Sequence, residues 1–202
     1  MTILSVEGLV KEYRRRWQTT FRLEASFTVE HPEIIGVMGP NGSGKTTLFE
    51  LITGSNTPSA GRVVCMGQDI HGVKARERDR LAIHYHQSYQ VRAFRKTKPA
   101  FLMQRAGRTR PLVHLFDEPQ FSVQDGYIGF MLDFFRSLRS QGRVVFLCLH
   151  PTERYHLEIL REVCERFIFV EKGRISLHPN FAALEADTRV SAYLGQSHEQ
   201  AS

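Results

Sequence analysis

Apolar and polar residues alternate near the start of the chain, which is the pattern of half-buried strands. The alternation runs through Leu4–Val6 and Phe21–Val29. Further along, short stretches rich in apolar and β-branched residues predict strands that are buried in a sheet. We expect these strands at residues 34–38, 62–66, 81–86, 112–116, 143–149 and 166–170, with a hairpin partner for the last one at 174–177.

Helical spacing of apolar residues appears between the strands. It is clearest over residues 125–140, and Gln141-Gly142 ends that helix. Strands that alternate with helices predict an α/β fold with a largely parallel sheet, and we expect residues 1–202 to form a single domain of this kind. Other helices are predicted at residues 48–52, 153–165 and 181–185, with a polar tail after the last of them, and the highly charged residues 74–80 are expected to be exposed.

Residues 39–47, GPNGSGKTT, match the pattern G-x-x-x-x-G-K-[ST] of a phosphate-binding loop. A predicted buried strand precedes the loop and a predicted helix follows it, which is the context that this loop needs. Backbone N–H groups and the helix N-terminus attract phosphate oxygens, Lys45 reaches the β- and γ-phosphates, and the Thr46 hydroxyl ligates Mg²⁺. The alternative, a glycine-rich turn that matches by chance, does not account for the flanking strand and helix.

Two further predicted strands end in side chains that suit nucleotide chemistry. Asp117 ends one apolar strand and is a candidate to hold Mg²⁺ through water, and Glu118 beside it is a candidate general base. His150 ends the next strand and is a candidate contact for a γ-phosphate. The simpler alternatives are a solvated turn before Pro119 and a strand-end histidine bonded to backbone. Because ligands bind at the carboxyl ends of parallel strands, we expect these side chains and the phosphate loop to form one nucleotide site.

Composition excludes several classes of protein. The apolar content of 42% supports a packed core and excludes a disordered chain. No apolar run approaches the roughly 20 residues of a membrane span, and the first residues lack the order of a secretory signal. The cysteines, Cys65, Cys148 and Cys164, have no C-x-x-C spacing, so we expect buried free thiols in a reducing cytosol and no metal bound by cysteine.

The net charge of +6 is concentrated in Arg14–Arg16 and in Arg92–Arg110. Such patches bind nucleic acid, an acidic membrane surface or an acidic partner, or they are solvated basic faces. Aromatic residues do not interleave with the basic residues in a stacking pattern, so nucleic acid is disfavoured as a partner.

Over nearly its whole length the chain resembles the ATP-binding subunit of an ABC transporter. Residues 39–48 resemble the family's Walker A motif, Asp117-Glu118-Pro119 its Walker B motif, and residues 169–175 its closing hairpin. The resemblance implies an ABC-type P-loop fold, with a mostly parallel sheet and a small antiparallel part, that binds ATP and Mg²⁺. It also implies Walker A contacts from Gly39, Asn41, Gly42, Ser43, Gly44, Lys45, Thr46 and Thr47, adenine stacking by Tyr13, a Q-loop glutamine at Gln87 that touches Mg²⁺ and water, and a switch histidine at His150.

One part of the family pattern is missing from the sequence. The family has a helical subdomain and an LSGGQ-type signature between the Q-loop and Walker B, but only 30 positions separate Gln87 from Asp117. Counted back from Walker B, the signature falls on Ala93–Thr97, where long cations replace the glycines. We therefore expect residues 88–110 to be a truncated remnant of the helical subdomain.

The resemblance implies transmembrane transporter subunits as partners and a cytoplasmic position on the inner face of the cell membrane. A homodimer would lack a signature in both sites, so a second ATP-binding subunit that supplies one is the expected partner. The first hypothesis is therefore an ATPase subunit of a transport complex, with Glu118 and His150 retained for hydrolysis. The alternative is a regulatory or structural subunit that binds nucleotide without turnover. A soluble relative that acts on nucleic acid or ribosomes fits less well, because such relatives carry two ATP-binding domains or long inserts.

Overall fold

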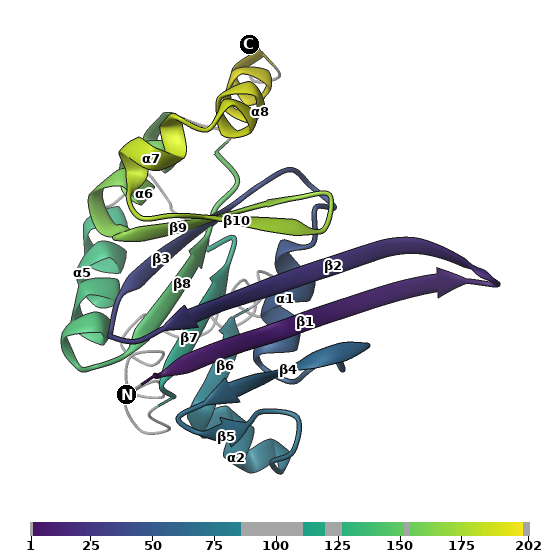
Figure 1. The fold of residues 1–202 in the computed structure, drawn as a ribbon. Coiled ribbons are helices and arrows are strands. Elements are labelled where there is room, and N and C mark those ends of the chain that lie inside the picture. Colours follow the sequence, from purple (N-terminus) through teal and green to yellow (C-terminus); the bar gives the residue numbers. More distant parts are fainter. Residues whose placement is uncertain (1, 86–110, 120–126, 152–153, 200–202) are drawn as a thin grey trace.

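The computed structural model describes residues 2–85, 111–119, 127–151 and 154–199. A ten-stranded sheet runs through this part of the chain in the order β5-β4-β1-β2-β10-β9-β3-β8-β7-β6 (Figure 1). Its strands are β1 (Leu4–Arg15), β2 (Gln18–Val29), β3 (Ile34–Met38), β4 (Ala60–Cys65), β5 (Gln68–Asp69), β6 (Ala82–Tyr85), β7 (Val113–Asp117), β8 (Val144–Cys148), β9 (Arg166–Glu171) and β10 (Arg174–His178).

The sheet has a parallel part and an antiparallel part. The strands β9, β3, β8, β7 and β6 pair in parallel, and β10 joins β2 in parallel through a short contact. The N-terminal strands β1, β2, β4 and β5 pair antiparallel, as do β9 and β10. This is the α/β P-loop arrangement predicted from the sequence, and its antiparallel part contains the two longest described strands, β1 and β2.

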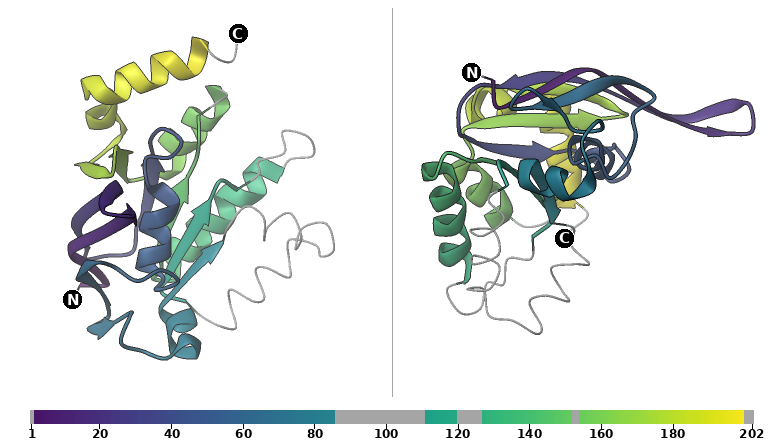
Figure 2. Two further views of the ribbon diagram at one scale, coloured as in Figure 1. Left: turned by 90° about the vertical axis from the view of Figure 1, so that its right-hand side faces the viewer. Right: turned by 90° about the horizontal axis from the view of Figure 1, so that it is seen from below.

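Helices pack on both faces of the parallel strands (Figures 1 and 2). The helix α1 (Lys45–Ile52) lies between the antiparallel and the parallel strands, and its four buried apolar side chains belong to the core that both parts share. Burying each such side chain stabilises the fold by about 1.5–3 kcal/mol. The opposite face is covered by α5 (Tyr127–Ser140) and α6 (Arg154–Val163), which form a second core with β3 and β8. The remaining helices are α2 (Ala75–Leu81), α7 (Phe181–Glu185) and α8 (Thr188–Glu199).

The polar tail predicted after residue 185 is wrong, because α8 continues the fold. Val190 is fully buried and Tyr193 is 8% exposed, and two residues three positions apart lie on one face of a helix. These side chains pack into the core formed with α5 and α6. Polar residues occupy most other positions of α8, so the sequence showed too few apolar residues for its short buried face to be recognised.

The charged segment at residues 74–80 is mostly exposed, as predicted, and forms most of α2. Its one half-buried arginine, Arg78, donates a hydrogen bond to the carbonyl oxygen of Gly54. The predicted remnant of the helical subdomain at residues 88–110, with the basic segment and Gln87 beside it, lies outside the described residues. Along the described chain, no helix has the length and apolar character that crossing a membrane requires.

The three cysteines are free and buried, as predicted. Burial raises the pKa of Cys65 to about 12, and it also raises the pKa values of Cys148 and Cys164. All three are therefore protonated thiols at neutral pH and weak nucleophiles.

His114 is a fully buried histidine on β7. Its Nδ1 is 3.1 Å from the hydroxyl of Tyr85 on β6, and its ring stacks with those of Tyr85 and Phe116. Burial, with a further contribution from the positive charge of Arg143, lowers the pKa of His114 to about 3. The imidazole is therefore neutral in the folded protein over the range in which most histidines become protonated.

We predict that His114 makes the protein less stable in mild acid. Between the ordinary histidine pKa of 6.5 and about 3, the unfolded chain binds a proton at this residue and the folded protein does not. The free energy of unfolding therefore falls by about 1.4 kcal/mol for each unit of decreasing pH. His114→Phe keeps an aromatic ring on the strand but has no group that titrates, so its free energy of unfolding should lack this contribution to the pH dependence. Urea denaturation of both proteins at several pH values measures the difference. Parallel pH profiles for the two proteins would contradict the assignment.

Candidate functional site

The predicted phosphate loop joins β3 to α1 beyond the carboxyl end of β3 (Figure 1). Its glycines have φ angles of 147° at Gly39, 74° at Gly42 and 113° at Gly44, which residues with a side chain rarely adopt. A Cβ atom at Gly39 would also collide with the carbonyl oxygen of Val170 on β9. The loop therefore needs glycine both for its path and for its close contact with the neighbouring strand.

The loop and the start of α1 present hydrogen-bond donors. The first N–H groups of a helix have no partners inside it, and Lys45, at the first helical position, is 6% exposed. Its Nζ donates to the carbonyl oxygens of Gly39 at 2.7 Å and Pro40 at 2.9 Å. The buried Ser43 Oγ has no hydrogen-bond partner among the described residues. Of the predicted loop contacts, Gly39, Ser43 and Lys45 are buried, Gly44, Thr46 and Thr47 are half-buried, and Asn41 and Gly42 are exposed.

Asp117, the last residue of β7, lies against the first turn of α1. Thr46 Oγ1 donates to Asp117 Oδ2 at 2.9 Å, and Nε2 of His84 on β6 lies 3.3 Å from the same oxygen. Burial raises the pKa of Asp117, but hydrogen bonds from His84 and Thr46 outweigh it, so the pKa is lowered overall. Asp117 is therefore ionised at neutral pH.

An ionised carboxylate bonded to a threonine hydroxyl is a donor set that fits Mg²⁺. This ion prefers oxygen ligands and is usually held by one or two carboxylates together with substrate phosphates and water. Among the described residues, no three His, Cys, Asp or Glu side chains converge as a metal cluster. The site thus suits a cation that arrives with a phosphate ligand better than a cation held by protein alone.

Glu118 and His150 follow β7 and β8 at the same edge of the sheet. Glu118 has a φ of 49°, uncommon for a residue with a side chain, and its N–H donates to the carbonyl oxygen of Cys148 at 3.0 Å. Burial lowers the pKa of His150, and the charge of Lys45 lowers it further, while the charge of Glu118 raises it. The imidazole is therefore neutral at pH 7, and its response to both charges places the three side chains in one site.

His150 is held in place by a residue outside the predicted site. Its Nδ1 is 2.8 Å from the hydroxyl of Tyr193 on α8, and the two rings are stacked with centroids 6.1 Å apart. No hydrogen bond from a described residue is recorded for the other ring nitrogen, Nε2. The C-terminal helix therefore orients the histidine and leaves Nε2 for a ligand.

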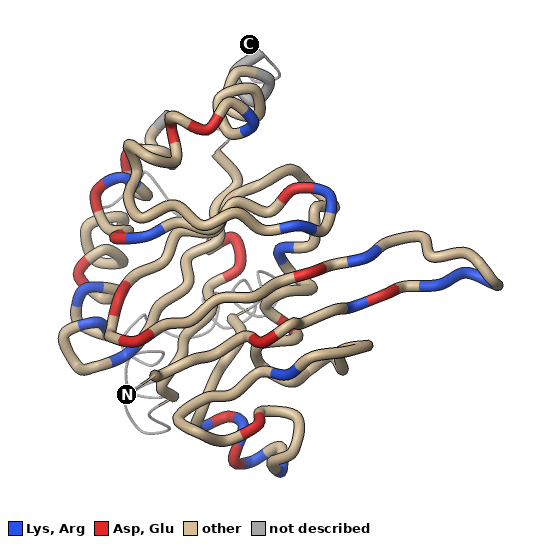
Figure 3. Tube along the Cα trace, viewed as in Figure 1, with Lys and Arg blue, Asp and Glu red and all other residues tan. Residues whose placement is uncertain are grey.

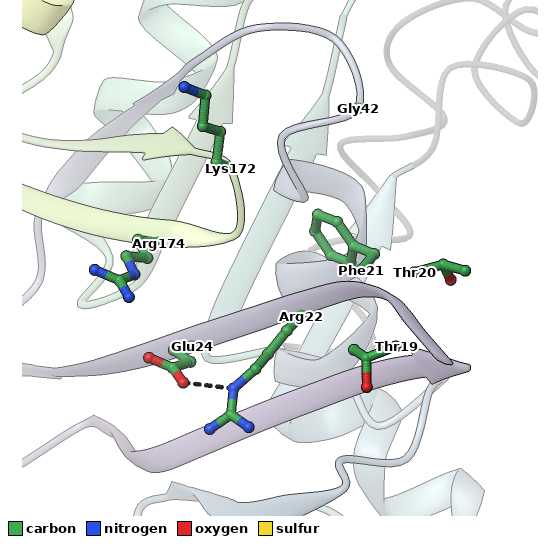
Figure 4. A pocket seen from close by; sticks show the side chains of 8 residues that line it. All are labelled: Thr19, Thr20, Phe21, Arg22, Glu24, Gly42, Lys172 and Arg174. Atoms are coloured by element: carbon green, nitrogen blue, oxygen red, sulfur yellow. Dashed lines mark hydrogen bonds and ion pairs between the residues drawn. The ribbon is translucent and has the colours of Figure 1, made fainter. Parts of the chain in front are cut away.

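A pocket of about 600 Å³ opens beside the phosphate loop (Figure 4). The Phe21 ring packs against the loop, since a Cβ at Gly44 would lie 2.9 Å from it. Lys172 and Arg174 add positive charge and have no ion pair with a described residue, whereas Arg22 is paired with Glu24 at 2.5 Å. The lining consists of Thr19, Thr20, Phe21, Arg22, Glu24, Gly42, Lys172 and Arg174.

Tyr13, the predicted adenine-stacking residue, lies on β1 and does not line this pocket. Its ring is 38% exposed and its centroid is 6.2 Å from that of Phe21. Its hydroxyl accepts a hydrogen bond from Asn56 Nδ2 at 2.8 Å. Tyr13 is therefore one aromatic ring away from the pocket, and Phe21 lies between it and the loop.

The structure brings the predicted side chains of the phosphate loop, Asp117, Glu118 and His150 together, while Gln87 lies outside the described residues. Sequence reasoning missed His84, Phe21 and Tyr193. The sequence did hold evidence for His84. It lies two residues after the apolar Ala82 in a strand, so both side chains point to the same face of the sheet, where His84 contacts Phe49 of α1 edge to face. The sequence held no such evidence for the other two. Phe21 has the pattern of an ordinary strand residue, and Tyr193 lay in the predicted polar tail.

Comparison with known proteins shows the fold of the chain and the family that part of its sequence resembles. The model of the ABC transporter family matches residues 23–98. Residues 23–98 are thus similar to an ABC transporter domain. The lipopolysaccharide export system ATP-binding protein LptB of Haemophilus influenzae is 38% identical over 85 residues, which are 42% of this chain and 34% of LptB. The molybdate/tungstate import ATP-binding protein WtpC of Pyrococcus horikoshii is 41% identical over 78 residues, 38% of this chain and 21% of WtpC.

Solved ABC cassettes extend the likeness in fold beyond this matched segment. A nucleotide-free ATP-binding cassette from an ABC transporter aligns with a TM-score of 0.74 at 19% identity, covering 96% of this chain and 99% of the other. A dimeric cassette bound to ADP and phosphate aligns at 0.67 with 16% identity, covering 87% and 98%. The described residues thus have the fold of these cassettes. The sequence matches span about a third or less of the curated relatives named above.

Proposed function

We propose that the chain is an ATP-binding subunit that binds Mg²⁺ and ATP and hydrolyses the nucleotide to drive a membrane transport complex. The observation that carries this proposal is the convergence of Lys45, Asp117, Glu118 and His150 at the carboxyl ends of β3, β7 and β8. An export and an import ATP-binding protein among the relatives support the role in transport. The related cassette with ADP and phosphate supports the nucleotide as the ligand.

The phosphates of ATP are proposed to lie in the loop at Gly39–Thr47. Backbone N–H groups of the loop and the positive end of α1 contact the phosphate oxygens. Lys45 exchanges its carbonyl partners in the loop for the β- and γ-phosphates, and Ser43 supplies its unpaired hydroxyl. Each of these contacts joins a donor on the protein to an anionic oxygen, which makes a hydrogen bond stronger.

Thr46, Asp117 and Gln87 are the residues proposed to hold Mg²⁺, with Asp117 acting through water. The ion would supply charge to neutralise the phosphate oxygens. The protein keeps Asp117 ionised and fixed in direction, because two hydrogen bonds from Thr46 and His84 converge on one of its oxygens.

Glu118 is proposed to be the general base for hydrolysis. Its carboxylate, part of the Walker B motif, accepts a proton from the attacking water, and Gln87 positions that water. His150 is neutral at pH 7, so its Nε2 is available to contact the γ-phosphate without adding a second fixed positive charge beside Lys45. Tyr193 fixes the tautomer and the direction of the ring by its hydrogen bond to Nδ1.

The partners proposed for this subunit follow from what its sequence lacks. Since Ala93–Thr97 cannot form an LSGGQ-type signature, we propose a second ATP-binding subunit that supplies one, and a heterodimer in preference to a functional homodimer. Transmembrane transporter subunits are the other proposed partners, which places the chain in the cytoplasm on the inner face of the cell membrane. Nucleic acid is not a proposed partner.

A regulatory subunit that binds ATP without turnover is the second candidate, and the missing signature favours it. One experiment separates the two: ATP hydrolysis by the purified chain, alone and in the complex recovered with its native partners. Activity in the complex supports the ATPase. Bound ATP with no activity in either sample supports the regulatory subunit, and failure to bind ATP would contradict both.

We predict that Lys45→Ala weakens ATP binding by at least about a hundredfold. A hydrogen bond to a charged group is worth about 1.5–3 kcal/mol, and Lys45 is proposed to make more than one. Binding of a fluorescent ATP analogue measures the loss, with Lys74→Ala as a matched control, because Lys74 is an exposed lysine before α2. Equal affinities for the two variants would remove Lys45 from the site.

Glu118→Gln is expected to leave ATP binding intact and to slow hydrolysis. The amide keeps the size of the carboxylate but cannot accept the proton, and general bases contribute about 10²- to 10⁴-fold to rates. Measuring affinity and turnover on the same preparation of the active complex separates the two effects. Unchanged turnover would exclude Glu118 as the base.

Two aromatic variants test which ring contacts the adenine. Tyr13→Ala should weaken ATP binding about three- to tenfold if Tyr13 stacks on the base, since an aromatic pair contributes about 0.5–1.5 kcal/mol beyond its buried area. Phe21→Ala should cost more, because Phe21 lines the pocket and packs on the phosphate loop. Tyr13→Phe is the control for the hydrogen bond to Asn56. An unchanged ATP affinity in Tyr13→Ala would exclude Tyr13 as the stacking residue and leave Phe21 as the candidate.

A further inference from the structure

The hairpin of β1 and β2 extends far beyond the rest of the sheet (Figures 1 and 2). On one side β1 pairs with β4 no further than Val10, and on the other side β2 pairs with β10 only at Glu24. Beyond these points the two strands pair only with each other, as far as Arg15 opposite Gln18. The end of the hairpin is thus a free two-stranded ribbon with a two-residue turn, Arg16-Trp17, at its tip.

Trp17 at this tip is 99% exposed. The other large apolar side chains that are exposed among the described residues show 38% to 44% of their surface. The exposed fraction of Trp17 is thus more than twice that of any of them. A single exposed apolar residue is common on protein surfaces, but a whole indole ring held in water on a projecting turn has no role in the fold. Arg16 before it has a φ of 55°, a left-handed conformation for which glycine or asparagine is the usual choice in a turn.

The tip is also the most basic part of the ribbon (Figure 3). Residues 11–24 contain five basic and two acidic residues. The two acidic ones are engaged near the base of the ribbon, where Glu12 pairs with Arg14 and Arg22, and Glu24 pairs with Arg22. Arg15 and Arg16 are exposed and have no ion pair with a described residue. Two guanidinium groups without an ion pair to a described residue therefore directly precede the exposed Trp17 in the sequence.

We propose that the tip, Arg14–Trp17, binds an anionic phospholipid surface. Indole rings locate at the level of the lipid headgroups because one part of the ring is apolar and its N–H is polar. Guanidinium groups form paired hydrogen bonds with phosphate, and each basic residue near an anionic bilayer adds to the attraction. The tip carries both an indole ring and guanidinium groups. Because it lies on a narrow projection, it can contact a flat surface without contact by the rest of the protein.

The size of the tip favours a membrane over an acidic protein. A stable protein interface buries about 800 Å² on each partner and places its tryptophan among other packed side chains. Here the residues after Trp17 are polar, Gln18, Thr19 and Thr20, so no apolar patch surrounds the ring. A bilayer needs no such patch, because each arginine and the indole finds its own headgroup contacts. Nucleic acid is disfavoured as well, since tight binding to a duplex takes more phosphate contacts than this tip can make.

Trp17 is the only tryptophan of the chain, so its fluorescence reports on the tip alone. We expect vesicles of equal parts phosphatidylglycerol and phosphatidylcholine to shift the emission of the full chain to shorter wavelength. Lipids brominated near the headgroup should quench the emission, and pure phosphatidylcholine vesicles should do neither. Raising the salt concentration should reverse the binding, because ionic attraction is screened.

Matched variants test the contribution of the arginines. Arg15→Gln with Arg16→Gln should weaken partitioning to the anionic vesicles about thirtyfold, which corresponds to about 2 kcal/mol for two charges. The control is Arg76→Gln with Arg80→Gln, which removes the same charge from exposed positions of α2 and should have little effect. Trp17→Ala, followed by vesicle sedimentation, should also reduce binding.

Three outcomes would overturn the proposal. Emission that anionic vesicles neither shift nor quench would exclude membrane contact at the tip. Equal losses in the two double-arginine variants would show that binding follows net charge and not this tip. A shift caused by an acidic polypeptide, with no shift by vesicles, would assign the tip to an acidic protein. None of these readouts depends on nucleotide, so they leave the proposed ATPase function untouched.

Discussion

The site depends on one close meeting of three backbone segments. Gly173, in the turn between β9 and β10, donates its N–H to the carbonyl oxygen of Ser43 in the phosphate loop, and its own carbonyl accepts the N–H of Glu24 on β2. A Cβ at Gly173 would collide with the carbonyl oxygen of Arg22, so any side chain there would push β2 away from the β9–β10 turn. Because these contacts join backbone to backbone, the loop, the β9–β10 turn and β2 hold each other in fixed positions.

The packing around the site also accounts for the charge states of Asp117 and His150. Asp117 is partly buried, which alone would favour the neutral acid, yet hydrogen bonds from His84 and Thr46 keep it ionised. His150 is kept neutral by burial and by the charge of Lys45. Both results depend on distances of a few ångströms between β6, β7, β8 and α1, which the two cores on either side of the sheet maintain. The packing of the sheet therefore sets the protonation states as well as the positions of the site residues.

The sequence predicted the parts of the molecule that are governed by local patterns. The strand at residues 34–38, the helix at 181–185 and the loop between Gly39 and Lys45 could be identified because apolar runs, helical spacing and glycine positions are properties of neighbouring residues. The contact of His84 with Asp117 and that of Tyr193 with His150 could not, because each joins segments far apart in the chain. The length of the β1–β2 hairpin was also missed. Its outer half is solvated on both faces and lacks the alternation by which half-buried strands are recognised.

The hairpin links the proposed membrane contact to the pocket through a single strand. Thr19, Thr20 and Phe21 of β2 line the pocket beside the phosphate loop, and the same strand begins one residue after Trp17. Two paired strands without further neighbours are marginally stable in water. Beyond the contacts of Tyr13 with Asn56 and of Phe21 with the phosphate loop, the ribbon pairs with no other strand. Binding of the tip to a surface would fix the ribbon at a second point and thereby restrict the movement of the pocket wall. Under this proposal, membrane contact affects the nucleotide pocket by restricting the movement of β2. It requires no change in the conformation of the phosphate loop or in the position of Asp117.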